Sequence, residues 1–590
     1  MAQLRLALAQ IDSWVGDVEG NSERVLRWAR HAAEQGAHLV LFPEMMLTGY
    51  PAEDLVLRRS FVDASRAAVE RLAARLAQAG LGELAVVVGY LDRCADPVPR
   101  VGRPAGEPQN AAAWLHRGKV AARYAKHHLP NYGVFDEFRY FVPGEHLPIV
   151  RLHGVDVATT ICEDLWQEGG PLVVARDAGA GLVVCINGSP YEVDKDDARC
   201  ALVCRRAADA GITIAYVNMV GGQDELVFDG DSVVVDPDGR IRARAPQFSE
   251  GCLVVDLDLP AASSELTGPV DARDRTDMHV ERVTISSDPL PPFPPLEAAV
   301  APRLSTEAEV YAAIVTGTRD YVEKNGFRSV VLGLSGGIDS ALTAVIAADA
   351  LGADKVHVVG MPSRYSSEGS VTDAEDLAAR VGLPWTIVPI GSVVSAYDVA
   401  LEPTGGLHGL AEENLQARVR GVLLMALSNE HGHLVLTTGN KSELATGFST
   451  LYGDSAGGFA PLKDLSKTWV YRLCRWRNKL AAERDEVEPI PEAIIVKAPS
   501  AELAPGQVDA DRLPDYDELD ALLDDYVGRD MGRAQLLAAG HDPATVDRVL
   551  RLVDLAEYKR RQYPPGPKIT LKAFGRDRRL PITNHWRDLP

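Results

Sequence analysis

The chain has 590 residues, of which 46% are hydrophobic and 24% charged, and its formal net charge is -22 at pH 7. A single hydrophobic core rarely grows beyond about 250–300 residues, so this length predicts two large domains. The acidic balance argues against a nucleic-acid partner, because phosphate contacts need clustered Lys and Arg.

The first residues, MAQLRLALAQIDSW, lack the basic start, apolar run and small-residue cleavage site of a signal peptide. We find no apolar run in the chain long enough to cross a bilayer. The seven cysteines are an odd number and are expected to be free thiols. We therefore predict a cytoplasmic protein with no membrane partner.

Residues 1–265 alternate between strand-like and helical patterns. LAVVVGY and ITIAYVN are typical of strands, DDARCALVCRRAADAG of a helix, and DSVVVDPDGRIRARA of a hairpin that turns at DPDG. Alternation of this kind predicts an α/β layered domain with mixed strands.

Clustered prolines separate this half from the next. Segment 266–302 contains SSDPLPPFPPLEAAVAP, and prolines sustain neither a helix nor a central strand, so we predict a semi-rigid linker. In residues 303–590 the runs SVVLGL, KVHVVGMP, WTIVPI and HLVLTTGN alternate with helical segments. This repeat predicts a doubly wound, Rossmann-like parallel sheet, whose ligands bind beyond the carboxyl ends of its strands.

A glycine-rich loop follows the first strand of this second half. In SVVLGLSGGIDSALTAVI it comprises Ser335, Gly336, Gly337, Ile338, Asp339 and Ser340. Two glycines permit a tight turn whose backbone N–H groups point at one anion, and the following helix N-terminus adds partial positive charge. The loop therefore predicts a phosphate or pyrophosphate site, with an empty strand-to-helix turn as the alternative. Its spacing is not that of a Walker A loop, and Asp339 would repel a phosphate unless Mg²⁺ lay between them.

SGGIDS resembles the pyrophosphate loop of the ATP-pyrophosphatase family, whose members split ATP between its α and β phosphates and form adenylates. The loop alone does not choose among GMP, asparagine and NAD synthetases and tRNA-modifying relatives. ENLQARVR, TTGNKSE and GFSTLYGDSAGGFAPLKDLSKTWVY closely resemble the NAD synthetases, over essentially all of residues 303–590. That resemblance implies ATP and deamido-NAD as substrates. It places Thr438 at ATP, Asp339 and Glu443 at Mg²⁺, and Asn414, Glu443 and Lys559 at deamido-NAD.

Basic residues near the end of the chain have two interpretations. EYKRRQYPPGPKITLKAFGRDRRLPITNHW is strongly basic in an acidic protein. It could be a solubilising tail, but the interleaved aromatic residues favour a cover for the pyrophosphate of a dinucleotide. Lys463 and Lys467 likewise could neutralise phosphates or form a solvated surface pair.

In the first half, Glu44, Lys126 and Cys162 each follow a strand-like run, in LVLFPE, YAKHH and TTICEDLW. A thiolate is a nucleophile, and a nearby ammonium lowers the pKa of its thiol. A carboxylate can take the thiol proton and return it to departing ammonia, while the ammonium stabilises the oxyanion. Each residue alone could be structural, but together they predict an amidase site.

The three residues resemble the Glu–Lys–Cys triad of the nitrilase (carbon–nitrogen hydrolase) family, over about residues 3–260. The resemblance implies an α-β-β-α sandwich. Positions that match its glutaminase members imply binding of L-glutamine by Tyr50, Tyr132, Phe135, Glu137, Glu163, Ser189 and Lys195. Glu137 is the second glutamate, which supports Lys126 and the substrate amide. Cys185, the rival thiol, is expected in the core, and the long Pro- and Gly-rich segment 92–109 departs from the family without a readable role.

The fusion of the two halves resembles glutamine-hydrolysing NAD synthetases. It implies that ammonia released from L-glutamine amidates deamido-NAD to NAD through an adenylated carboxylate. One alternative is another ATP-pyrophosphatase amidotransferase with a different carboxylate acceptor. A catalytically inactive binding scaffold is the other, although Cys162, Asp339 and Glu443 are all present. We also predict a homo-oligomer.

Overall fold

The computed structural model describes residues 2–94, 106–262, 278–586 and 588. The chain forms two compact units, the first comprising Met1–Gln223 with Val227–Leu304 and the second Asp224–Leu226 with Ser305–Pro590. Most of the insertion expected at 92–109 lies outside the described residues, as does the domain boundary expected at residue 265. Within the described part of the chain, no helix is both long and apolar enough to cross a membrane.

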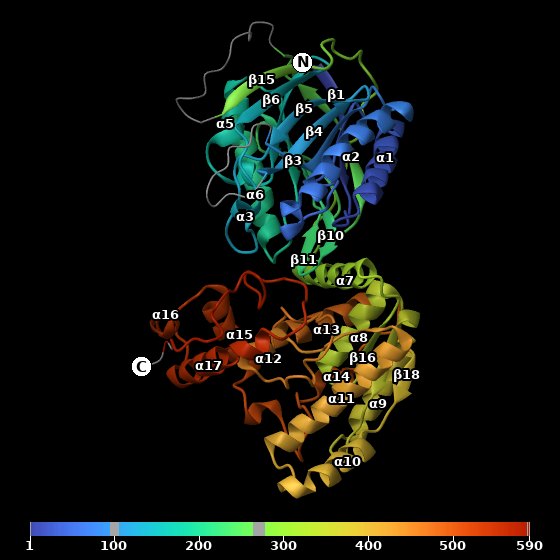
Figure 1. Ribbon diagram of the computed structural model, residues 1–590, viewed down its shortest axis with the longest axis vertical. Helices are drawn as coiled ribbons and strands as arrows, with labels where there is room; N and C mark the ends of the chain where they lie inside the picture. The colour runs from blue at the N-terminus through green and yellow to red at the C-terminus, as the bar shows by residue number, and fades with distance from the viewer. Residues whose placement is uncertain (1, 95–105, 263–277, 587, 589–590) are drawn as a thin grey trace. The chain divides into compact units, whose positions relative to one another are not determined.

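Two sheets form the centre of the first unit (Figure 1). One has the order β14-β1-β2-β3-β4-β5, and its strands are β1 (Ala2–Gln10), β2 (Leu39–Leu41), β3 (Ala85–Arg93), β4 (Pro108–His116), β5 (Lys119–Ala125) and β14 (Gly251–Leu259). The other has the order β13-β12-β9-β8-β7-β6-β15. Its strands are β6 (His146–Leu152), β7 (Val155–Ile161), β8 (Leu182–Asn187), β9 (Thr213–Asn218), β12 (Val233–Val235), β13 (Ile241–Arg244) and β15 (His279–Thr284). A separate two-stranded ribbon joins β10 (Val220–Gln223) to β11 (Leu226–Asp229).

Strand β1 shows how these sheets are buried on both faces. Leu4, Leu6 and Leu8 belong to the core between the sheets, whereas Ala7 and Ala9 belong to a second cluster with residues of two helices. Successive side chains of a strand point to opposite faces, so strand β1 is apolar on each. A sheet covered on both faces is therefore expected from its near-continuous apolar strands.

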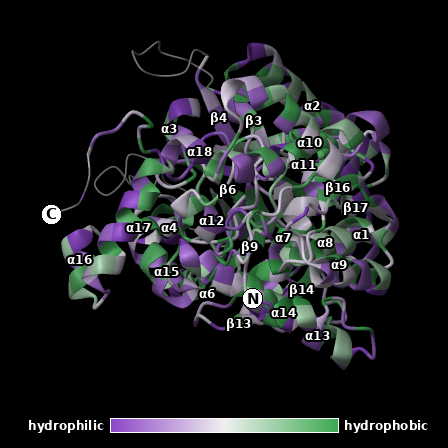
Figure 2. Ribbon diagram, turned by 90° about the horizontal axis from the view of Figure 1, so that it is seen from below, coloured by the Kyte–Doolittle hydropathy of each residue, from purple (hydrophilic) through white to green (hydrophobic). Residues whose placement is uncertain are grey.

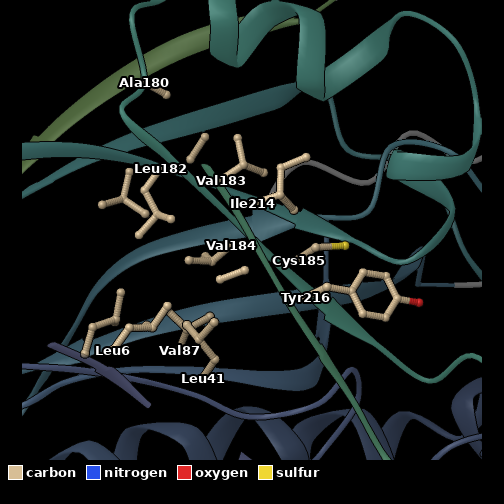
Figure 3. Packing of buried hydrophobic residues seen from close by; sticks show 14 of the residues in the cluster. Leu6, Leu41, Val87, Ala180, Leu182, Val183, Val184, Cys185, Ile214 and Tyr216 are labelled. Carbon is tan, nitrogen blue, oxygen red and sulfur yellow. The ribbon is translucent and has the colours of Figure 1, made fainter. Parts of the chain in front are cut away.

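The core between the sheets is closely packed, as Figure 3 shows. Leu6 and Leu41 of one sheet lie across from Leu182 of the other. Trp114 of β4 donates a hydrogen bond from Nε1 to Thr159 Oγ1 of β7 at 2.8 Å. The indole thus satisfies its one donor while it fills the space between the layers.

Helices cover the outer face of each sheet, which confirms the predicted α-β-β-α sandwich. Helices α1 (Val18–Glu34) and α2 (Arg59–Gln78) cover the first sheet, and α5 (Gly170–Asp177) and α6 (Lys195–Ala210) cover the second. Two single-turn helices, α3 (Glu137–Tyr140) and α4 (Glu163–Trp166), lie between strands in the sequence. The hairpin predicted at DPDG is confirmed as the antiparallel pair β12–β13.

The structure differs from the linker expected over 266–302. Strand β15 pairs in parallel with β6, with His279 opposite His146. Farther on, the carbonyl of Pro294 accepts a hydrogen bond from Arg5 Nη2 at 2.8 Å, so this segment lies against the first unit. The cluster of prolines that breaks regular structure begins at Pro289, whereas HVERVT before it carries the β-branched residues that favour a strand.

The second unit contains the predicted doubly wound parallel sheet, in the order β18-β17-β16-β19. Its strands are β16 (Val330–Gly333), β17 (Val356–Gly360), β18 (Trp385–Ile387) and β19 (Leu434–Val435). The chain moves outward from β16 to β18 and then returns to β19 on the other side of β16. This reversal creates a switch point between β16 and β19, where ligands bind in such sheets.

Helices surround this sheet and build a second cluster beyond it (Figure 1). They are α7 (Thr306–Lys324), α8 (Ile338–Leu351), α9 (Glu368–Val381), α10 (Gly391–Leu401), α11 (Leu410–His431), α12 (Lys441–Thr446), α13 (Lys467–Glu483), α14 (Glu492–Val496), α15 (Tyr516–Leu523), α16 (Arg533–Ala538), α17 (Pro543–Leu555) and α18 (Glu557–Arg560). Figure 2 shows hydrophilic and hydrophobic residues alternating along α15 and α17. Their apolar sides form the cluster beyond the sheet, which includes Leu519, Leu522 and Val549.

Candidate active sites

The first unit gathers the predicted triad at the ends of three strands. Glu44 follows β2, Lys126 follows β5 and Cys162 follows β7, and all three residues are buried. Lys126 Nζ donates hydrogen bonds to Glu44 Oε1 at 2.8 Å and to Glu137 Oε1 at 2.9 Å. A buried ammonium thus lies between two carboxylates, and the charges of Lys126 and Glu44 both act on the Cys162 thiol.

Cys162 occupies a sharp turn between β7 and α4. Its φ of 45° and ψ of -98° lie outside the conformations that side chains with a Cβ usually adopt. Its backbone N–H donates to the carbonyl of Ile186 at 3.1 Å, which helps to hold this turn. Strain of this kind is found where a strand-to-helix turn presents a nucleophile.

The pKa of the Cys162 thiol is raised, not lowered as the sequence predicted. Burial is the largest effect and raises the pKa of Cys162 well above its usual value, and Glu44 raises it further against the opposing effect of Lys126. Burial alone would lower the pKa of Lys126, but Glu137 and Glu44 raise it well above its usual value. Cys162 is therefore a protonated thiol beside a charged lysine, and the thiol must lose its proton as the sulfur attacks.

Two groups that the sequence analysis missed complete the surroundings of Glu44. Asn110 Nδ2 donates to Glu44 Oε1 at 2.6 Å, and the Gly188 N–H donates to Glu44 Oε2 at 2.8 Å. Together with Lys126, these donors fix both carboxylate oxygens in place. Asn110 and Gly188 lie 66 and 144 residues from Glu44, and no local pattern marks them.

Glu137, the predicted second glutamate, has one oxygen engaged and one without a hydrogen bond. Its Oε1 accepts from Lys126 and, at 3.2 Å, from Tyr50 Oη, whereas the buried Oε2 has no partner in the described structure. Burial is the largest effect on this carboxyl and raises its pKa to about 7. A buried acceptor without a partner is costly, so Oε2 is suited to receive a donor from a substrate.

Four of the other residues predicted to bind glutamine form a row of contacts that begins at Glu163, next to Cys162 in the sequence. Tyr132 Oη donates to Glu163 Oε2 at 2.9 Å, and the Tyr132 ring lies edge-on to Phe135 at 5.5 Å between centroids. Lys195 Nζ lies 5.7 Å from the centre of the Phe135 ring. Ser189 follows Gly188 and is held by Asn218, whose Oδ1 accepts from the Ser189 N–H at 2.9 Å.

The rival thiol Cys185 lies in the hydrophobic core of the first unit, as predicted. Burial raises its pKa to about 12, and its Sγ donates to Asn187 Oδ1 at 3.3 Å. A buried, protonated thiol in a strand packs as a small apolar side chain.

In the second unit the predicted loop connects β16 to α8 at the switch point. Gly336 has a φ of 77°, and a Cβ there would lie 2.1 Å from the carbonyl oxygen of Ser370, so the position requires glycine. Ser335 Oγ accepts from the Gly337 N–H at 3.2 Å and lies 3.1 Å from Ser340 Oγ. These bonds hold the loop in a compact turn before the helix.

A cavity of about 720 Å³ opens beside this loop. Every residue predicted to bind nucleotide, dinucleotide or metal lines it: Ser335, Gly336, Gly337, Ile338, Asp339, Ser340, Asn414, Thr438, Glu443 and Lys559. Lys467 also lines the cavity, whereas Lys463 is not among its lining residues. The β16 and β19 loops thus meet at one pocket, as the strand order requires.

Two carboxylates and a lysine form the charged part of this cavity. Lys467 Nζ donates to Asp339 Oδ2 and lies 3.7 Å from Glu443 Oε1. Asn440 caps α12, accepts from the Glu443 N–H at 3.0 Å, and donates to Asp339 Oδ1 at 3.0 Å. Burial first, and Asp339 second, raise the pKa of Glu443 to about 8, so a cation between the two carboxylates would be favourable.

The basic segment near the end of the chain contains a residue that lines the cavity and a residue that is buried in the local fold. Lys559 Nζ lines the cavity and donates to the carbonyls of Gly447 at 2.8 Å and Ser449 at 2.7 Å. Arg560, by contrast, is buried and donates to the carbonyl of Ala445 at 2.7 Å and to Glu557 at 2.7 Å. The prediction that Lys559 acts together with its basic neighbours therefore needs correction, because Arg560 stabilises the local fold.

Lys497 is a cavity residue that the sequence analysis missed. Its Nζ donates to the carbonyl of Gly336 at 3.2 Å and to Ser370 Oγ at 3.3 Å, and it pairs with Asp373. The ammonium therefore lies against the glycine-rich loop. Its place in VKAPSAEL, after a proline-interrupted stretch, carries no pattern that points to a phosphate site.

The first unit joins a nitrilase-like sandwich to a buried Glu–Lys–Cys cluster. The second joins a doubly wound sheet to a pyrophosphate-type loop at its switch point. Together these features define an ATP-dependent amidotransferase with a separate amidase domain.

Comparisons with known proteins identify the family. Residues 5–264 match the carbon–nitrogen hydrolase family and residues 310–563 match NAD synthase. The glutamine-dependent NAD(+) synthetase of Thermotoga maritima is 43% identical over 592 residues, and that of Aquifex aeolicus is 42% identical over 589. The alignments cover 100% and 99% of this chain, and 100% of each relative. The glutamine-dependent NAD+ synthetase of Acinetobacter baumannii, solved with adenosine diphosphate, is 40% identical with a TM-score of 0.72 and full coverage of both chains.

The chain belongs to the glutamine-dependent NAD(+) synthetases. The resemblance drawn from its motifs is thereby confirmed, and so is the expectation of a ligase. The alternatives of a different carboxylate acceptor and of a binding scaffold fall away.

Proposed function

We propose that Cys162 of the first unit hydrolyses L-glutamine and that the cavity beside Ser335–Ser340 of the second unit binds ATP and deamido-NAD. The overall reaction follows from the family: glutamine-dependent synthesis of NAD from deamido-NAD, ATP and glutamine. The observation that carries the assignment of the first site is the Lys126 ammonium held between Glu44 and Glu137 and acting on the Cys162 thiol.

In the amidase step, Cys162 Sγ attacks the carboxamide carbon of glutamine while Glu44 takes the thiol proton. Lys126 donates to the oxyanion of the tetrahedral intermediate. The carbon–nitrogen bond breaks, and Glu44 returns the proton to the departing ammonia. Water then attacks the thioester, Glu44 takes a proton from this water, and glutamate leaves as the thiol forms again.

In the synthetase step, a carboxylate oxygen of deamido-NAD attacks the α-phosphorus of ATP and pyrophosphate leaves. The N-terminus of α8, which follows the loop, and the Lys497 ammonium beside Gly336 are suited to bind the leaving pyrophosphate. Ammonia attacks the carbon of the acyl adenylate, and AMP departs with the oxygen, which yields the carboxamide of NAD. Asn414 and Lys559 line the same cavity and are assigned to deamido-NAD.

Asp339 and Glu443 are the residues that would hold Mg²⁺. They fit a hard cation because Asp339, after burial, helps to raise the pKa of Glu443, and a cation beside the two carboxylates would favour the ionised form of Glu443. Within the described residues no group of three or more His, Cys, Asp or Glu side chains is placed to hold a metal, so phosphate oxygens would complete the ligand set. Mg²⁺ would neutralise charge on the polyphosphate of ATP.

The products of the complete reaction test this proposal. Incubation with glutamine labelled with ¹⁵N at the amide, ATP and deamido-NAD should give labelled NAD, glutamate, AMP and pyrophosphate. Mass spectrometry of NAD and chromatography of the adenine nucleotides would measure these products. Formation of ADP and phosphate, or of NAD without the label, would contradict the assigned chemistry.

Replacement of Lys559 with Ala should weaken deamido-NAD binding. A charge-assisted hydrogen bond is worth about 1.5–3 kcal/mol, so we expect the KM for deamido-NAD to rise roughly tenfold or more. The KM for glutamine in the hydrolysis step should stay nearly constant, because that site lies in the other unit. An Arg579→Ala variant removes an exposed cation of the same segment and serves as the control. A Lys559→Ala enzyme with an unchanged KM for deamido-NAD would assign Lys559 to local structure alone.

The homo-oligomeric state and the cytoplasmic location stay predictions. Light scattering of the purified protein would test the first.

A further inference from the structure

Asp164 is a buried carboxylate that the proposed reaction leaves without a role. It lies in α4, two residues after Cys162, and its exposed fraction is 0%. A buried ionised group is costly unless hydrogen bonds satisfy it. Asp164 accepts four such bonds, and their donors come from the two segments that carry Cys162 and Lys126.

The Oδ1 atom of Asp164 holds the chain that follows Lys126. It accepts from the backbone N–H of His127 at 3.1 Å and from that of His128 at 2.8 Å. The backbone of Lys126 is held by β4, because the Lys126 N–H donates a hydrogen bond to the carbonyl of Asn110 at 2.8 Å. The position from which the lysine side chain leaves the backbone is therefore fixed on both sides.

The Oδ2 atom of Asp164 accepts the remaining two hydrogen bonds. It accepts from the N–H of Ile161 at 2.9 Å, the residue before Cys162, and from Tyr124 Oη at 2.6 Å. Tyr124 lies on β5, two residues before Lys126. One carboxylate thus ties the end of β5 to the strained turn after β7.

We propose that Asp164 is a positioning residue for glutamine hydrolysis. It holds the Lys126 ammonium and the Cys162 thiol at a fixed separation and orientation. The proposal rests on Cys162 being the nucleophile, as assigned above. Lys126 and Cys162 follow strands of different sheets, β5 and β7, so strand pairing within one sheet does not fix their separation. Asp164 supplies that connection through backbone atoms next to both residues.

Only a carboxylate can accept all four bonds. An asparagine has one oxygen and one NH₂ group, so whichever way its side chain turns, the NH₂ faces backbone donors. If it faces Ile161, the turn before Cys162 loses its acceptor. If it faces His127 and His128, the segment after Lys126 is released. Either orientation should disturb the alignment while the glutamine-binding row beside Tyr132 remains.

The test is a comparison of Asp164→Asn with the parent enzyme, using the full chain. A displacement of about 1 Å from productive geometry can cost about 100-fold in rate, so kcat for glutamine hydrolysis should fall about 100-fold. The KM for glutamine should stay within about twofold. Iodoacetamide should alkylate Cys162 more slowly, as measured by mass spectrometry of its peptide. Ammonia-dependent NAD synthesis should be unchanged, because it uses the other unit.

Two further variants separate positioning from general stability. Asp156→Asn removes a buried carboxylate from β7, the strand that leads to Cys162. Asp156 binds Arg151 at 2.8 Å and lies at the strand end remote from Cys162. This variant should keep the parent kcat. Tyr124→Phe removes one bond to Asp164 without disturbing the backbone donors, and it should lower kcat about tenfold with an unchanged KM.

The outcomes decide the proposal. A parental kcat in Asp164→Asn would overturn it, and so would an equal loss of kcat in Asp156→Asn. If Asp164→Asn fails to fold, Tyr124→Phe decides, and a parental kcat there also overturns the proposal. Cys162→Ala is measured in parallel: if it keeps glutaminase activity, the nucleophile itself is wrongly assigned, which is a different failure from that of Asp164.

Discussion

Replacement of Cys162 with Ala is expected to abolish glutamine-dependent NAD formation while ammonia-dependent formation continues. Loss of a nucleophile in a hydrolase typically costs at least about 10⁴-fold in kcat. The synthetase cavity lies in the second unit and is lined without Cys162, so it should accept free ammonia at the parental rate. Glutamate release and NAD formation, each measured with glutamine and with ammonium, would check both halves of this expectation.

Cys185→Ala is the matched control for this experiment. It removes a second buried thiol from the adjacent strand β8, but this thiol lies in the core and has no role in the proposed reaction. It should keep most of the glutaminase activity in the folded protein. Retained hydrolysis in Cys162→Ala together with its loss in Cys185→Ala would reverse the assignment of the nucleophile.

Asp339→Asn and Glu443→Gln are each expected to remove NAD synthesis with either nitrogen source. Asp339→Asn removes a carboxylate from the wall of the cavity where the polyphosphate and its cation are placed, and Glu443→Gln removes the second carboxylate, whose raised pKa a bound cation would lower. Asp339→Asn also leaves the buried Lys467 ammonium without its closest carboxylate. Removal of one such electrostatic contact typically lowers kcat by about 100-fold or more. Steady-state NAD formation with ammonium over a range of Mg²⁺ concentrations would measure the loss.

A partly exposed carboxylate of the same unit provides the control. Asp376 pairs with Arg380 along α9, and Asp376→Asn should leave synthesis unchanged. Glutamine hydrolysis, measured as the rate of glutamate release, should persist in all three variants. Parental ammonia-dependent turnover in Asp339→Asn at saturating Mg²⁺ would refute the role given to this carboxylate.

The main groups of both sites could be predicted from local sequence. Glu44, Lys126 and Cys162 each follow a strand-like run, and residues that follow neighbouring strands can meet in one site at the edge of the sheets. The Ser335–Ser340 loop could be recognised from its local sequence, because glycines between a strand and a helix favour an anion-binding turn. The fold classes followed for the same reason: the period of each apolar run and the order of the runs are local properties.

Contacts between distant segments could not be predicted in this way. Asn110 and Gly188 reach Glu44 only after β4 and β8 have taken their places, and Lys497 reaches Gly336 across 161 residues. The strand β15 inside the expected linker is of the same kind, since pairing with β6 outweighed the prolines that follow it.

By itself, then, the sequence determined the two fold classes and the family, and it predicted the reacting groups, because each depends on residue type and short-range spacing. The tertiary structure alone decided how those groups are charged and held. Cys162 has a raised pKa because folding buries it, an effect that no pattern of neighbours in the chain contains. Lys559 lines the cavity while Arg560 binds carbonyls of α12, although the two are adjacent in the sequence. Burial and long-range hydrogen bonds arise only when the chain folds, and they give different roles to residues of the same type in similar local sequences.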